Sequence, residues 1–171
     1  MKNTVRIGII GIGNMGSIHA RTILGGKVDR LTLAGISDQS VDRRDLFPEV
    51  PFFEDPEALI QSPEVDAVLV ATPHFDHTRL GLATFRAGKH LLVEKPISVH
   101  KADCQRLIAG HDNPEQVFAA MFNQRTDPRY VKLKELIEGG QLGAIRRVVW
   151  IITDWFRTER YYASGGWRAT W

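Results

Sequence analysis

The stretch VRIGIIGIGNMG, residues 5–16, decides the fold of this chain. An apolar run leads directly into Gly11, Gly13 and Gly16, which have the spacing G-x-G-x-x-G, and a segment with helical periodicity follows. A strand, a glycine-rich turn and a helix in this order predict the first βαβ unit of a dinucleotide-binding fold. A glycine-rich turn that binds no ligand is the alternative.

Each glycine of this loop has its own physical reason. Gly11 permits the tight turn, Gly13 lets the backbone approach a pyrophosphate, and Gly16 lets helix and strand pack closely. Asn14 and Met15 begin the helix, whose first N–H groups are unpaired and carry a partial positive charge. We therefore expect all five residues to contact the phosphates of a dinucleotide.

The chain up to residue 122 alternates short Val, Ile and Leu runs with segments of helical spacing. Strands are predicted at residues 4–10, 31–37, 51–53, 66–72, 90–94 and 116–121. Helices are predicted at residues 15–24, 55–61, 76–87 and 99–109, with a weaker helix from a cap at Ser40 to before Pro48. Because the strands are apolar on both faces and helices link them, we predict an α/β fold with a doubly wound parallel sheet.

From residue 123 the pattern changes. An amphipathic helix is predicted first, with Tyr130, Leu133 and Ile137 on one face, and residues 144–156 then read as one long strand. No later strand can pair with it, so its hydrogen-bonding groups stay unmatched unless it joins the edge of the first sheet.

The patterns divide the chain into two parts. Residues 1–122 are predicted to form a dinucleotide-binding Rossmann domain, and residues 123–171 the beginning of a second α/β domain. The unmatched strand leads us to expect that the second domain is truncated.

Composition excludes several classes of protein. With 171 residues, 43% hydrophobic and 25% charged, the chain has the composition of a globular protein. Its net charge of +2 comes from interspersed charges, so nucleic acid is not an expected partner. No apolar stretch approaches the roughly 20 residues that a membrane span needs. Cys104 is the only cysteine and cannot form an internal disulfide, which favours the reducing cytoplasm.

Asp38 ends the second predicted strand, where a carboxylate can accept hydrogen bonds from the ribose hydroxyls of adenosine. This favours NAD as the cofactor. Arg43 and Arg44 follow closely, and an arginine there could instead pair with a 2′-phosphate, so NADP stays open. Asp38 could also merely cap the next turn.

Polar residues follow the fourth predicted strand, in the segment ATPHFDHT that starts at residue 71. Ligands of open parallel sheets bind beyond the carboxyl ends of the strands, so we expect this segment to line the cofactor groove. The residues concerned are Thr72, Pro73, His74 and His77. His74 and His77 could also form a metal pair, but no cluster supplies a third ligand, so no metal is predicted.

The fifth predicted strand ends in Glu94 and Lys95, where substrate and nicotinamide should meet. Lys95 could donate a hydrogen bond to a substrate oxygen and stabilise developing alkoxide charge, and partial burial would make proton transfer possible. We predict Lys95 as the catalytic residue. A surface ion pair with Glu94 in front of Pro96 is the alternative.

Five features together carry a resemblance to a known family. They are GIIGIGNMGSIHA from residue 8, Asp38, ATPHFDH from residue 71, AGKHLLVEKPIS from residue 87 and FNQRTDPRYVKLKELIEGGQLGAIRRV from residue 122. The chain resembles the amino-terminal half of the Gfo/Idh/MocA family of NAD(P)-dependent oxidoreductases. The resemblance implies a Rossmann domain followed by an α/β domain with a large open sheet. It also implies action on sugars, inositols and related polyols or their keto forms.

The resemblance implies roles for single residues as well. Glu94 would hold the nicotinamide ribose side, and Lys95 would be the lysine of the catalytic site. Substrate-side positions would be Asn123, Arg125, Trp167 and Arg168. The acid/base histidine of the family comes from its second half, and neither His100 nor His111 stands in a matching context.

We therefore predict the NAD(P)-binding part of a dehydrogenase that transfers a hydride between nicotinamide and a sugar, inositol or related polyol. Alone it would be poorly active. The full-length form would be a homo-oligomer, or this chain would associate with the missing half. A non-catalytic dinucleotide-binding sensor or partner-docking module is the alternative, and a methyltransferase is a weaker rival because its glycine loop has a different spacing.

Overall fold

A computed structural model describes residues 4–153 and 156–163 of the chain. The chain divides into two compact units, Met1–Phe122 and Asn123–Trp171, which are described separately. The first unit contains the sheet and the residues around the glycine loop.

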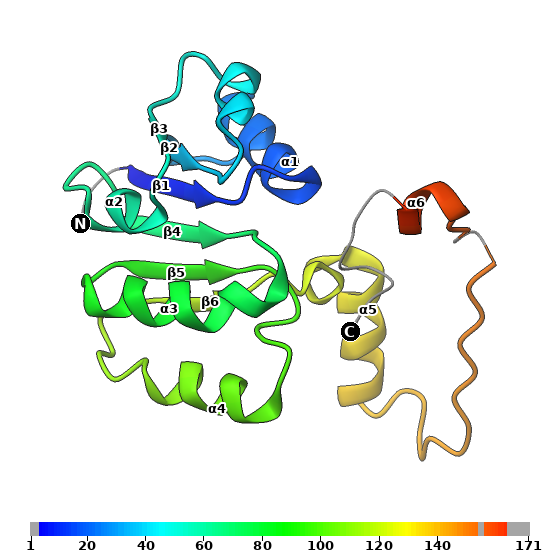
Figure 1. Cartoon of the computed structure of the whole chain (residues 1–171). Helices are drawn as coiled ribbons and strands as arrows, with labels where there is room; N and C mark the ends of the chain where they lie inside the picture. Colours follow the sequence, from blue (N-terminus) through cyan, green and yellow to red (C-terminus); the bar gives the residue numbers. More distant parts are fainter. Residues whose placement is uncertain (1–3, 154–155, 164–171) are drawn as a thin grey trace. The chain divides into compact units, whose positions relative to one another are not determined.

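The first unit is built on one six-stranded sheet with the order β3-β2-β1-β4-β5-β6 (Figure 1). The strands are β1 (Val5–Ile10), β2 (Leu31–Ser37), β3 (Phe52–Phe53), β4 (Ala67–Val70), β5 (His90–Val93) and β6 (Phe118–Ala120). All neighbouring strands pair in parallel. The prediction of a doubly wound parallel sheet is confirmed.

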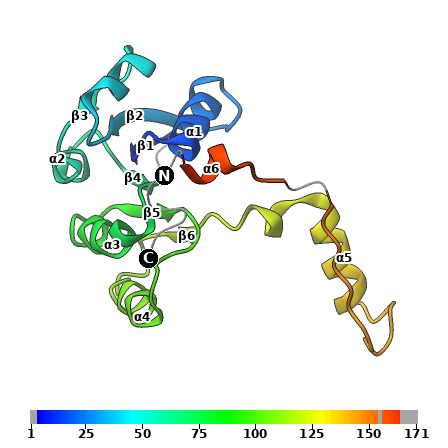
Figure 2. The ribbon, with the colours of Figure 1, turned by 45° about the vertical axis from the view of Figure 1, so that its right-hand side comes forward.

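Helices cover both faces of the sheet. They are α1 (Asn14–Leu24), α2 (Pro56–Gln61), α3 (His77–Arg86) and α4 (Lys101–Ala109). In β4, Leu69 packs with Ile23 of α1 on one face, and Val68 packs with residues of α2, α3 and α4 on the other. Figure 2 shows α3 and α4 next to each other on one side of the sheet and α1 on the other. This alternation explains why the strand sequences are apolar at consecutive positions.

The segment after β2 differs from the prediction. Residues Val41–Leu46 form a 3₁₀ helix, η1, rather than an α-helix, and the Ser40 side chain makes no capping hydrogen bond. None of its residues is buried, so no apolar face stabilises a longer helix. The buried side chains that anchor this segment, Phe47 and Val50, come after it.

The second unit contains the 3₁₀ helix η3 (Asn123–Thr126), α5 (Pro128–Glu138) and α6 (Glu159–Ala163). The amphipathic helix predicted here is therefore present. The strand predicted over residues 144–156 is wrong for the described residues, which have no regular structure there. Val148 and Ile151 are 78% and 77% exposed, and the described residues offer no strand edge with which they pair. An extended segment without such an edge gains no ladder hydrogen bonds and cannot become a strand.

Candidate cofactor-binding site

The first glycine of the loop is required by both its conformation and its surroundings. Gly11 has a φ of +92°, and its N–H donates to the Ser37 carbonyl oxygen at 2.8 Å. A Cβ at Gly11 would lie 2.7 Å from the backbone nitrogen of Thr72, closer than real side chains come. The loop is therefore pressed between the ends of β2 and β4.

The other two glycines have opposite surroundings. A Cβ at Gly16 would overlap the Gly11 carbonyl oxygen, so this glycine serves the packing of α1 on the loop. A Cβ at Gly13 would meet nothing within 4 Å. The missing side chain of Gly13 thus leaves open space at the start of α1. This is the arrangement expected where a pyrophosphate approaches the backbone.

The start of α1 provides donors for such a group. The first hydrogen bond of the helix runs from the Ser17 N–H to the Gly13 carbonyl oxygen at 2.9 Å. The amides of Asn14, Met15 and Gly16 therefore precede the first intrahelical donor, and they face the helix end. Backbone N–H groups with the positive end of a helix dipole favour an anion.

Two buried hydroxyls flank the loop. Among the described residues, Ser37 Oγ at the end of β2 and Thr72 Oγ1 after β4 have no hydrogen-bond partner. Buried hydroxyls without partners are rare in folded proteins and often point to a group that is not part of the chain. Both observations fit a polar ligand beside Gly11.

Asp38 is half-buried and already accepts two backbone hydrogen bonds. Its Oδ2 accepts from the Ile12 N–H at 2.6 Å, and its Oδ1 accepts from the Ser40 N–H at 2.9 Å. The carboxylate thus fixes the glycine loop and caps the next turn, the competing use expected from the sequence. A carboxylate has about four lone-pair sites, so acceptor capacity remains for ribose hydroxyls.

The segment after β4 places its residues at different depths. Pro73 is exposed and His74 is half-buried, whereas His77 has no exposed surface. His77 Nδ1 lies 2.9 Å from the Pro96 carbonyl oxygen, and its Nε2 lies 3.0 Å from the Thr72 carbonyl oxygen. His77 thus lies behind the loops after β4 and β5 and joins them. Both of its ring nitrogens are occupied, and no group of three metal-ligating side chains exists among the described residues.

His74 is partly exposed to solvent, whereas His77 is not. Burial lowers the pKa of His74, and the neighbouring His77 and Lys95 lower it further. It is therefore a neutral imidazole at neutral pH and can both donate and accept a hydrogen bond.

Glu94 does not pair with the Lys95 ammonium as the sequence alternative suggested. It is 7% exposed, its Oε1 lies 2.7 Å from His19 Nε2, and its Oε2 accepts from the Lys95 N–H at 3.2 Å. Burial raises the pKa of Glu94, but the hydrogen bond and charge of His19, together with Lys95, outweigh it, so the pKa is lowered. Lys95 itself is exposed at the carboxyl end of β5.

His19 was missed at the sequence level. It follows Gly16 by one turn of α1, so helical spacing puts it on the side of the helix that carries the glycine loop. That spacing was the available signal. The helical spacing could not identify Glu94 as the partner of His19, because Glu94 is distant in sequence.

All four residues predicted on the substrate side belong to the second unit. Asn123 and Arg125 lie in η3 of the second unit. Trp167 and Arg168 lie outside the described residues.

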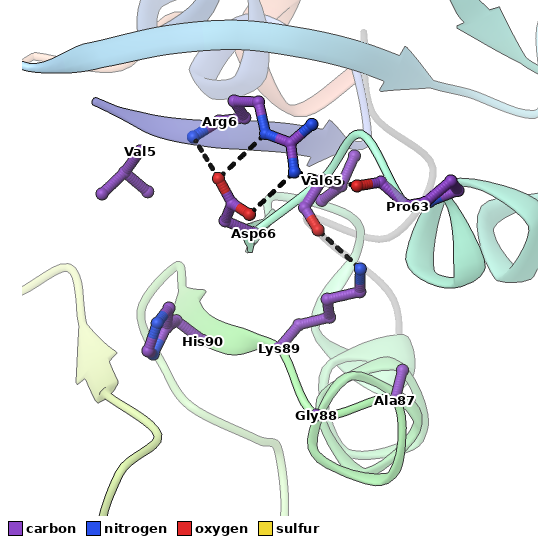
Figure 3. Close-up of a pocket in the computed structure, with 9 residues that line it drawn as sticks. All are labelled: Val5, Arg6, Pro63, Val65, Asp66, Ala87, Gly88, Lys89 and His90. Atoms are coloured by element: carbon purple, nitrogen blue, oxygen red, sulfur yellow. Dashed lines mark hydrogen bonds and ion pairs between the residues drawn. The ribbon is translucent and has the colours of Figure 1, made fainter. Parts of the chain in front are cut away.

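A pocket of about 550 Å³ lies at the amino ends of the strands, whereas the glycine loop lies at their carboxyl ends. Figure 3 shows that its cations face other groups of the chain: Arg6 contacts Asp66, and Lys89 contacts the Val65 carbonyl oxygen. Arg6 also pairs with Glu64. These charges hold the ends of β1, β4 and β5 together, so size alone does not make this hollow a binding site.

No helix in the described part of the chain is long and apolar enough to cross a membrane.

Comparisons with known proteins agree with this geometry. The Gfo/Idh/MocA model, an oxidoreductase family with an NAD-binding Rossmann fold, matches residues 5–122. A myo-inositol 2-dehydrogenase of Thermotoga maritima is 38% identical over 143 residues, which cover 81% of this chain and 42% of that protein. An inositol 2-dehydrogenase of Saccharopolyspora erythraea is also 38% identical, over 82% of this chain and 43% of its own length.

A solved structure with ligands is similar as well. The scyllo-inositol dehydrogenase of Lactobacillus casei, with bound NAD(H) and scyllo-inositol, has a TM-score of 0.75 and 31% identity. The match covers 82% of this chain and 42% of that one. The chain therefore spans less than half the length of these relatives.

Proposed function

Because the chain belongs to the Gfo/Idh/MocA oxidoreductase family through its NAD-binding Rossmann domain, we propose that it is the cofactor-binding part of a polyol dehydrogenase. The reaction would transfer a hydride between NAD and an inositol or a related sugar or polyol. The observation that carries the proposal is the open space at Gly13, at the start of α1 and next to the loop fixed by Asp38. The inositol dehydrogenases among its relatives support the substrate class.

The nicotinamide of a bound dinucleotide would supply the hydride chemistry. Four parts of the chain would hold the cofactor. The amides at the start of α1 would bind the pyrophosphate, Asp38 would accept from ribose hydroxyls, and Thr72 and His74 would line the nicotinamide end. Glu94, fixed by His19, would hold the nicotinamide ribose side.

Lys95 is the residue that we propose for contact with the reacting oxygen. It is exposed beyond the carboxyl end of β5, the edge at which parallel sheets bind ligands. Its ammonium makes no hydrogen bond or ion pair with the described residues, so its three N–H donors are available. An ammonium there would stabilise the alkoxide charge that develops when the hydroxyl loses its proton before hydride transfer to the cofactor, and in the reverse direction it would polarise the carbonyl that receives the hydride.

The acid/base group of the reaction has no counterpart in this sequence. We propose that it and most substrate contacts belong to a second half, beside Asn123, Arg125, Trp167 and Arg168, and that the full form is a homo-oligomer in the cytoplasm. The 171-residue chain would then bind NAD(H) and oxidise inositol only slowly.

The proposal is tested by measuring NADH binding and inositol-dependent NADH formation with the wild-type chain, Gly13→Ala and Lys95→Met. We expect NADH binding by the wild type, weakened binding by Gly13→Ala, and unchanged binding with less turnover by Lys95→Met. Wild-type protein that does not bind NADH would contradict the proposal. Turnover that Lys95→Met leaves unchanged would contradict the role proposed for Lys95. NADH binding without any inositol-dependent NADH formation would favour the alternative, a non-catalytic dinucleotide sensor.

A further inference from the structure

The contact between His19 and Glu94 joins two segments from opposite sides of the point where the strand order reverses. From this point the sheet continues as β1-β2-β3 in one direction and as β4-β5-β6 in the other. His19 belongs to α1, which follows β1, whereas Glu94 directly follows β5. Ligands of open parallel sheets bind at such a point, beyond the carboxyl ends of the strands. The contact therefore links the two halves of the sheet at their ligand-binding edge.

Both side chains of this contact are largely removed from water. The side chains of His19 and Glu94 are 17% and 9% exposed, and His19 Nε2 lies 2.7 Å from Glu94 Oε1. Because an ionised carboxylate only accepts hydrogen bonds, the His19 ring is the donor. Burial raises the pKa of Glu94, but the contact with His19 outweighs it and keeps the carboxylate ionised. A buried carboxylate that loses such a partner is strongly destabilised, so Glu94 depends on His19 for its orientation.

The other oxygen of the same carboxylate holds the peptide of Lys95. Glu94 Oε2 accepts from the Lys95 N–H at 3.2 Å, so the carboxylate bridges the His19 ring and the backbone of the next residue. On the other side of Lys95, the Pro96 carbonyl oxygen lies 2.9 Å from His77 Nδ1. The backbone around Lys95 is thus held before and after the residue. The long lysine stem is flexible, so this backbone position decides where the ammonium can reach.

We propose that His19 is a positioning residue: through the Glu94 carboxylate it fixes the peptide of Lys95 and thereby the region that the ammonium reaches. The inference rests on the proposed function, in which Lys95 contacts the reacting oxygen. A displacement of about 1 Å can reduce the rate about a hundredfold, so a residue that acts only through another still affects turnover. Since His19 follows Gly16 by one turn, it also couples the helix at the proposed pyrophosphate site to this lysine.

The variants of the full chain that test the inference are His19→Ala, His19→Gln and a matched control. His19→Gln keeps a side-chain N–H that can donate to Glu94. The control is His111→Ala, because His111 is also half-buried and its Nε2 lies 2.7 Å from the Gln116 carbonyl oxygen, before β6. Circular dichroism verifies that each variant is folded.

The first measurement needs no cofactor and determines the NMR order parameters of the backbone amides. We expect the order parameter of the Lys95 amide to fall from about 0.85 toward about 0.6 in His19→Ala, because its acceptor is no longer held. His19→Gln and His111→Ala should both keep the wild-type value at Lys95. The Leu91 amide, which donates to the Val117 carbonyl oxygen inside the sheet, should stay rigid in every variant. A residue that only adds global stability would not loosen one peptide selectively.

The second measurement is a double-mutant cycle on inositol-dependent NADH formation at saturating NAD⁺ and inositol. We expect His19→Ala to lower kcat about tenfold in the wild-type chain. In the Lys95→Met chain the same change should have less than about a twofold effect, because His19 acts through the lysine that has been removed.

Three results would overturn the inference. They are an unchanged order parameter of the Lys95 amide in His19→Ala, a His19→Gln chain as loose at Lys95 as His19→Ala, and an equal loss of kcat with and without Lys95. In each case, NADH binding by the wild-type chain leaves the proposed function standing. If the wild-type chain does not bind NADH, the proposed function is wrong and the inference loses its catalytic part. The order parameters then still decide whether His19 fixes the peptide of Lys95.

Discussion

Replacing Gly13 by alanine should separate folding from cofactor binding. Gly13 has φ −75° and ψ −158°, an extended conformation that alanine adopts without strain, and its Cβ would meet nothing within 4 Å. Replacing glycine by alanine restricts the unfolded chain and thereby stabilises the folded state by about 0.4–1 kcal/mol. Losing glycine as a favoured N-cap residue of α1 destabilises the folded state by a similar amount. We therefore expect the free energy of unfolding to change by less than about 1 kcal/mol, a shift in Tm of less than about 4 °C for a chain of this length.

The same methyl group should interfere with the pyrophosphate. It would occupy the space through which phosphate oxygens reach the amides at the start of α1. Each charge-assisted hydrogen bond contributes about 1.5–3 kcal/mol, so weakening one or two of them should reduce the binding free energy of the dinucleotide by about 3 kcal/mol. This corresponds to a roughly hundredfold rise in the Kd for NADH, measured by isothermal titration.

Gly16→Ala is the matched control, because it adds the same methyl group to the same loop where there is no room for it. The Cβ at Gly16 would overlap the Gly11 carbonyl oxygen. Forcing the loop away from α1 should destabilise the fold by about 1–3 kcal/mol or more, visible as a lower Tm in thermal unfolding. Two results would refute the reasoning: a folded Gly13→Ala chain that binds NADH as well as the wild type, or a loss of Tm in Gly13→Ala as large as in Gly16→Ala.

Three further changes test the packing, the capping and the electrostatics. Leu107→Ala should cost about 2–5 kcal/mol in chemical denaturation, because Leu107 is fully buried; a cost below about 1 kcal/mol would contradict the packing of α4. Asp55→Ala should cost about 1 kcal/mol, since the Asp55 side chain accepts from the Glu57 N–H at the start of α2, and Asp55→Asn should retain most of that. The lowered pKa of Glu94 means that its ionised form stabilises the fold above the ordinary value of 4.5 and that this contribution disappears as the pH falls through the folded pKa. Glu94→Gln should therefore lower the Tm most at neutral pH, with a difference from wild type that shrinks below about pH 4.5; a difference that stays constant with pH would contradict the pairing with His19.

The fold of the first unit could be predicted because its signals are local. Each strand is a short apolar run, and the consecutive apolar positions of β4, such as Val68 and Leu69, report burial on both faces. The sequence pattern predicts a longer, α-helical segment after Ser40 than the 3₁₀ helix η1 that the structure has. The pattern contains no information on whether an apolar face of this segment is buried. The strand over residues 144–156 failed because strand formation depends on a neighbouring edge, which propensity cannot supply.

The site could be predicted less completely than the sheet. Spacing identified the glycine loop and Asp38, because both depend on residues close in sequence. The partner of Glu94 and the position of His77 depend on contacts between distant segments, and a spacing pattern contains no information on such contacts.

The contacts of the His77 ring with two loops have a consequence for ligand affinity. Its ring links the carbonyl oxygens of Thr72 and Pro96, and next to it the Thr78 hydroxyl donates to Ser98 Oγ at 2.8 Å. The loops that follow β4 and β5 are thereby ordered during folding rather than at the moment of association. If a dinucleotide binds against these loops as we propose, they need little ordering at that moment, so association would cost less conformational entropy.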